Sequence, residues 1–153
     1  MSNLSVGGIL WVSFVAGIIA TLGMEMLLRK ITRAGWANAD MVRAIGSIFT
    51  RSLDTAYRVG IIIHTISGII FAFVYTMIIS LIGVHGFLNS AAAGLLIGFI
   101  HGAVVGFILV VTVAEHHPLP EFREAGFSVA LAHWGAHLLY GLLVGIVVGF
   151  MQG

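Results

Sequence analysis

The sequence predicts an all-α protein, an integral membrane four-helix bundle with an amphipathic interfacial helix between its first and second spans. Hydrophobic residues make up 59% of the 153 residues and charged residues only 8%, whereas a soluble domain carries roughly 25% charged residues. The charged residues also lie in two windows, 25–58 and 115–124, which leaves three long stretches without charge. These observations exclude a soluble enzyme and a basic nucleic-acid-binding domain, and we expect one membrane domain over residues 1–153.

The uncharged stretches contain all of the sequence that can cross a membrane. A helical span needs about 20 apolar residues, so the stretch 59–114 is long enough for two spans joined by a turn near His85. The residues before Val6 include no Lys or Arg, so we expect the first stretch to be a span and not a cleaved signal peptide. The four expected spans cover about residues 8–30, 60–82, 89–115 and 126–151.

Residues 40–58, between the first two spans, have the pattern of an amphipathic helix. Apolar side chains recur at helical spacing from Met41 to Ala56, and charged side chains take the other faces. Asp40 stands where a helix N-cap is expected. Such a helix lies at the membrane interface, and a docking surface for a partner subunit is the alternative interpretation.

The basic residues all fall on one side of the predicted four-span topology. Four spans place the two charged connections on one side, and both termini and the turn near His85 on the other. By the positive-inside rule the charged side is cytoplasmic, so we expect a multi-pass protein of the cytoplasmic (inner) membrane with both termini outside. The basic residues on the expected cytoplasmic side are Arg29, Lys30, Arg33, Arg43, Arg51, Arg58 and Arg123.

Glycines form rows at every fourth residue of the third and fourth spans. Such rows let helix backbones approach closely, which supplies much of the packing energy between helices in lipid. We therefore expect both spans to press against a neighbour. The expected partners are the lipid bilayer and other membrane subunits or a second copy of the chain, with no nucleic acid. The rows are Gly94, Gly98, Gly102 and Gly106, and Gly141, Gly145 and Gly149.

Histidine is frequent for so apolar a chain, with 7 residues. An ionisable side chain inside a membrane is costly and marks a functional site by default, with its partner nearby. At about 1.5 Å of helix rise per residue, His64 lies about 6 Å, His133 about 10 Å and His137 about 16 Å from the cytoplasmic ends of their spans. His133 and His137 are also one turn apart, on the face of the fourth span that carries Gly141.

The spacing of His133 and His137 suits two ligands of a transition-metal ion. His64 and a carboxylate from Glu25 or Glu115 complete a site rich in nitrogen. Such a site favours copper, iron or zinc over magnesium or calcium.

Haem b is the alternative cofactor. Two axial histidines must then lie at similar depth on different helices. The pairs that meet this condition are His64 with His133, and His101 with His137.

Short patterns rich in glycine, alanine and aromatic residues occur along most of the chain. They are Ala16–Met24, Asp40-Met41, His64-x3-Gly68 with Phe71-Ala-Phe-Val-Tyr75, and His101-Gly102. Together they resemble an uncharacterised family of small bacterial four-span membrane proteins, known as a domain of unknown function. The resemblance implies the four-span architecture and no established activity.

The sequence thus suggests a metal- or haem-binding accessory subunit of a larger membrane redox complex. Two alternatives stay open: a purely structural subunit whose histidines bond to one another and to the backbone, and a proton or metal-ion conduit through the bundle. No nucleophile–base pair or phosphate-binding loop occurs, so we do not expect an enzyme that acts on its own.

Overall fold

A computed structural model describes residues 5–109 and 113–152, and this part of the chain is helical with no β-strand. Four of the helices are long and apolar enough to cross a membrane. The predicted fold class is confirmed. In chain order the elements are α1 (Val6–Arg33), α2 (Met41–Thr50), α3 (Leu53–Leu81), α4 (Phe87–Ile108), α5 (Ala114–His116), a 3-10 turn (Pro120–Phe122) and α6 (Phe127–Gln152).

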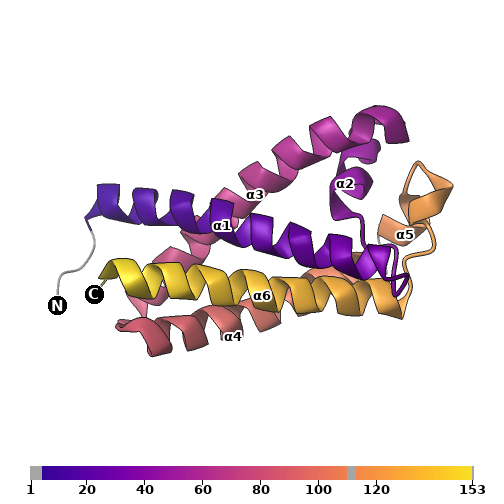
Figure 1. The fold of residues 1–153 in the computed structure, drawn as a ribbon. Coiled ribbons are helices and arrows are strands. Elements are labelled where there is room, and N and C mark those ends of the chain that lie inside the picture. The colour runs from indigo at the N-terminus through magenta and orange to yellow at the C-terminus, as the bar shows by residue number, and fades with distance from the viewer. Residues whose placement is uncertain (1–4, 110–112, 153) are drawn as a thin grey trace.

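The four long helices pack in the order α3, α1, α6, α4 (Figure 1). α4 and α6 share the most extensive contact, and α1 packs on both α6 and α3, whereas α3 and α4 touch little. α3 diverges from α4 toward the end of the bundle where α2 and α5 lie (Figure 1). The start of α1 and the end of α6 lie at the opposite end, as the four-span topology requires.

Residues 40–58, expected to form one amphipathic helix, are divided in the structure between α2 and the start of α3. α2 begins after Asp40, whose carboxylate accepts a hydrogen bond from the Arg43 backbone N–H at 3.0 Å, as an N-cap does. α2 ends because Arg51 takes a left-handed conformation with φ of 52°. α3 then follows almost at once, so the apolar positions beyond residue 52 belong to the second long helix.

α2 folds back onto the first turns of α3 through two glycines. A Cβ at Gly46 would overlap the Ala56 carbonyl, and a Cβ at Gly60 would overlap the Val42 carbonyl. The two backbones are therefore in direct contact. The other face of α2 exposes Phe49, which agrees with the predicted amphipathic character, and the place of α2 at a membrane interface stays a prediction.

The third long helix, α4, covers residues 87–108, whereas the expected span covers residues 89–115. Leu109 and Val113 are also helical, residues 110–112 lie outside the described part of the chain, and α5 is a single short turn. His117 then ties the following segment to α2, because its Nε2–H donates to the Ala44 carbonyl at 3.0 Å. His117 therefore has a structural role.

α4 and α6 are in backbone contact along their glycine rows. A Cβ at Gly94 would overlap the Gly141 carbonyl, and a Cβ at Gly98 would overlap the His137 carbonyl. The prediction that both rows press against a neighbour is confirmed, and for each row that neighbour is the other helix of the α4–α6 pair.

We predict that Gly145→Leu separates α4 from α6, because a side chain there would meet the Ser90 carbonyl. Gly135→Leu is the matched control, since Gly135 lies on the same helix with no atom within 4 Å of its Cβ position. We expect Gly145→Leu to lower the free energy of unfolding by about 3 kcal/mol and Gly135→Leu by less than about 1 kcal/mol. Thermal unfolding of the purified variants in detergent measures the difference, and equal stabilities would contradict the packing.

Single cysteines can test the predicted orientation, because the chain has no cysteine of its own. Thr55 near the start of α3 and Asn89 near the start of α4 are exposed at opposite ends of the bundle. We expect an impermeant thiol reagent on intact cells to label Asn89→Cys and not Thr55→Cys, as the positive-inside rule requires. Labelling of Thr55→Cys alone would invert the orientation.

Candidate functional site

Two buried histidines lie one turn apart on α6 and share a hydrogen-bonding pattern. His133 Nδ1–H donates to the Val129 carbonyl at 2.8 Å, and His137 Nδ1–H donates to the His133 carbonyl at 2.7 Å. A carbonyl oxygen only accepts, so the hydrogen of each neutral ring is on Nδ1 and Nε2 keeps its lone pair. The His133 Nε2 is buried and has no hydrogen-bond partner among the described residues.

His64 of α3 joins this pair. Its Nε2 is also buried without a partner in the described part of the chain. His64 lines the same cavity as His137, and His133 lies one turn before His137 on α6. The structure therefore places two of the predicted histidines, His64 and His137, at one cavity wall, with His133 one turn away on α6.

His101 of α4 lies beside His137. Its Nδ1 and the Tyr75 hydroxyl are hydrogen-bonded at 3.0 Å, and its ring centroid lies 4.3 Å from that of Phe71. The rings of His101 and His137 meet edge to face, with centroids 4.7 Å apart. Rings in such contact leave no room for a porphyrin between them, so this arrangement does not accommodate haem on that pair.

A cavity of about 290 Å³ lies beside these histidines, and residues of α1, α2, α3, α4 and α6 line it. Imidazoles from three helices reach its wall, those of His64, His101 and His137. The cavity is close in volume to the smaller ligand sites of proteins and far larger than a metal ion. Apolar residues of the wall include Met24, Met41, Ile45, Phe71, Val105 and Leu109.

Two further polar side chains lie at the wall of this histidine-lined cavity. The Tyr140 hydroxyl donates to the Gly68 carbonyl at 2.5 Å, so it is satisfied and ties α6 to α3. Thr21 Oγ1 is buried close to Gly68 and has no partner within the described residues. Two of the residues that line the cavity therefore each carry a buried polar atom without a partner among the described residues, Thr21 Oγ1 and His64 Nε2.

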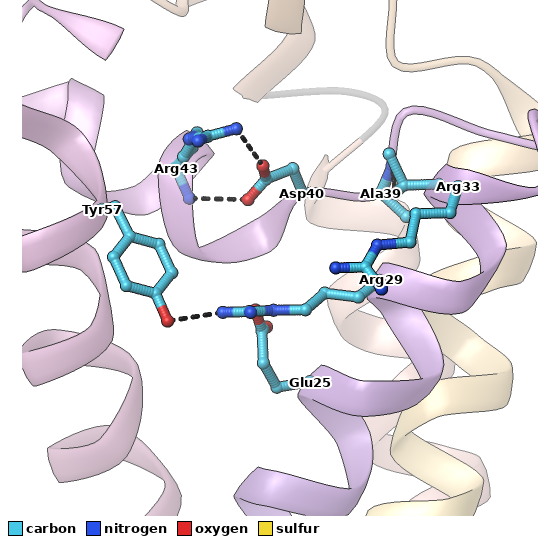
Figure 2. A pocket seen from close by; sticks show the side chains of 8 residues that line it. Glu25, Arg29, Arg33, Ala39, Asp40, Arg43 and Tyr57 are labelled. Atoms are coloured by element: carbon cyan, nitrogen blue, oxygen red, sulfur yellow. Dashed lines mark hydrogen bonds and ion pairs between the residues drawn. The ribbon is translucent and has the colours of Figure 1, made fainter. Parts of the chain in front are cut away.

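The two predicted carboxylate ligands do not join the histidines. Glu25 accepts a hydrogen bond from Arg29 Nε at 2.6 Å and lines a separate cavity between α1, α2 and α3 (Figure 2). Glu115 is exposed on α5. Among the described residues no three His, Asp or Glu side chains are placed to hold a metal ion. The predicted metal set is therefore not assembled, because an arginine one turn along α1 takes the Glu25 carboxylate.

Several residues of the cavity wall were not predicted from the sequence as site residues. Tyr140 follows His137 by three residues, so helical spacing alone places it on the same face. Met41 and Ile45 carry no such signal, because they reach the cavity only through the packing of α2 against α3.

No family model, curated protein or solved structure matches the chain. Membership of the four-span family and a place in a redox complex therefore stay predictions. The function is inferred below from the histidine-lined cavity itself.

Proposed function

We propose that this chain is a multi-pass membrane protein that binds a small lipid-soluble molecule in its histidine-lined cavity. The supporting observation is an apolar wall within the bundle that carries three imidazoles and leaves Thr21 Oγ1 and His64 Nε2 without partners. Small-molecule sites combine apolar walls with a few placed polar groups in this way. The ligand would have an apolar ring or chain and one or two hydroxyl or carbonyl groups.

The side chains of the wall define the chemistry of this ligand. The lone pair on His137 Nε2 accepts from a hydroxyl group, His64 Nε2 donates or accepts according to its tautomer, and the Thr21 hydroxyl donates to a carbonyl. Phe71 and Tyr140 supply aromatic surface for a planar ring. Quinols and quinones are redox-active molecules with this chemistry, which is consistent with the hypothesis of an accessory subunit in a membrane redox complex.

The ligand would enter from the bilayer. α3 packs on α1 and diverges from α4 (Figure 1), and residues of both α3 and α4 line the cavity. A lipid-soluble molecule concentrates in the bilayer because its apolar surface is removed from water there. An opening between two spans suits such a route.

We expect the purified protein in detergent to bind decylubiquinone, measured by isothermal titration calorimetry. His64→Ala should weaken the affinity about tenfold, because one hydrogen bond to the ligand is lost. His85→Ala is the matched control, since His85 lies in the turn between α3 and α4 and outside the cavity wall. Equal affinities of the wild-type protein and His64→Ala, or no binding by either, would contradict the proposal.

A transition-metal ion is the second candidate ligand, favoured by the unpartnered Nε2 atoms of His64 and His133. Metal-binding histidines usually donate their other ring nitrogen to a carbonyl or carboxylate, as His133 and His137 do here. The thioethers of Met24 and Met41 line the same cavity, and thioether with imidazole favours copper. The histidines would have to approach one another to share an ion, since no group of three is in place among the described residues.

His133→Ala separates the two candidates, because His133 is not among the described residues that line the cavity. If copper binds, this variant should lose it while its affinity for decylubiquinone stays within about twofold of the wild type. His64→Ala should impair both. Copper is measured by elemental analysis of the purified proteins, and stoichiometric copper retained by His133→Ala would exclude the metal site.

A further inference from the structure

A second cavity, of about 240 Å³, lies between the end of α1, the start of α2 and the first turns of α3. It shares no lining residue with the histidine-lined cavity. Three arginines line it, Arg29 and Arg33 from α1 and Arg43 from α2, and Tyr57 of α3 closes one side (Figure 2). This arginine-lined cavity lies at the end of the spans and has no part in the function proposed above.

Two of the arginines have partners inside the cavity. Arg29 Nε donates to Glu25 at 2.6 Å, and Arg29 Nη2 donates to the Tyr57 hydroxyl at 2.5 Å. Arg43 Nη1 donates to Asp40 at 3.3 Å. The two carboxylates neutralise two of the three arginines, which leaves the cavity with one excess positive charge.

Arg33 provides the excess charge. It has no ion pair or hydrogen bond of its side chain within the described residues. Figure 2 shows its guanidinium pointing into the space between Arg29 and the pair formed by Asp40 and Arg43. A guanidinium presents five N–H donors in a planar fork that matches the oxygens of a phosphate group. The arginine-lined cavity therefore has unused donors and the charge that an anion requires.

An exposed apolar stripe leads along α1 to the two arginines. Leu22, Met26, Arg29 and Arg33 follow one another at helical spacing and share one face of α1. Leu22 is 56% exposed and Met26 is 60% exposed. Apolar side chains thus face outward within the span, and cationic side chains follow them at its end.

We propose that the arginine-lined cavity binds the phosphate group of an anionic phospholipid, with the acyl chains lying along Leu22 and Met26. Arginine forms strong, frequently bidentate hydrogen bonds with phosphate, and basic pockets between spans bind acidic headgroups. A free phosphate ion offers the same chemistry to Arg33. The exposed stripe on α1 favours the lipid, because the acyl chains of a lipid can pack on an apolar surface and a free phosphate ion cannot.

The test reconstitutes the full chain in vesicles of phosphatidylcholine mixed in equal amounts with phosphatidylglycerol. The protein is then extracted in mild detergent, and the lipid that stays bound is measured by mass spectrometry. We expect retained phosphatidylglycerol to exceed phosphatidylcholine, and Arg33→Gln to lower this preference about fivefold. Lys30→Gln is the matched control: it removes the same charge from the same last turn of α1, and Lys30 does not line the cavity. The control should keep the preference of the wild type.

Three outcomes would overturn the lipid site. Equal retention of both lipids by the wild type would show that the cavity selects no anionic headgroup. An equal loss in Arg33→Gln and Lys30→Gln would show general attraction of the basic surface. The third outcome is that the detergent-solubilised protein binds inorganic phosphate, that Arg33→Gln loses this binding, and that neither protein prefers one lipid. This outcome would assign the cavity to a soluble anion.

Leu22→Gln alters the apolar stripe and leaves the arginines unchanged. This variant should lower lipid retention and leave phosphate binding unchanged.

Discussion

Backbone contact between α4 and α6 is the constraint on which the rest of the bundle depends. Helices in lipid gain little from burying apolar side chains, so close approach at glycine carries their association. The same contact positions the site, because Gly98 and Gly102 both face His137. The ring of His137 is thereby held against that of His101 from the neighbouring helix. Packing and candidate function therefore rest on the same glycines.

The histidine-lined cavity exists because close packing is unevenly distributed. α3 is held by α1, where a Cβ at Gly17 would meet the backbone of Ile69 and a Cβ at Gly68 would meet Thr21. α3 is also held by α2 at its first turns. α3 therefore contacts α4 little, and residues of both helices line the cavity.

The two cavities differ in the free-energy terms that a ligand would meet. In the bundle, polar atoms without partners are expensive, so His64 Nε2 and Thr21 Oγ1 favour a molecule that can bond to them. Near the end of α1, Arg33 is exposed, so an excess positive charge is tolerated there. The cavity inside the bundle therefore suits an uncharged ligand, and the arginine-lined cavity suits an anionic one.

The sequence by itself determined the helical class, the four apolar helices and the shared face of His133 and His137, because composition and helical period are local properties. It also placed Asp40 as the cap of α2. Helical spacing places Arg29 one turn after Glu25, and only the tertiary structure decided that this pair lines a separate cavity and stays apart from the histidines. It likewise decided that Met41 reaches the cavity wall. Both outcomes depend on how α2 packs against α3 and how α3 packs against α1, and no residue pattern within one helix encodes the angle between two helices.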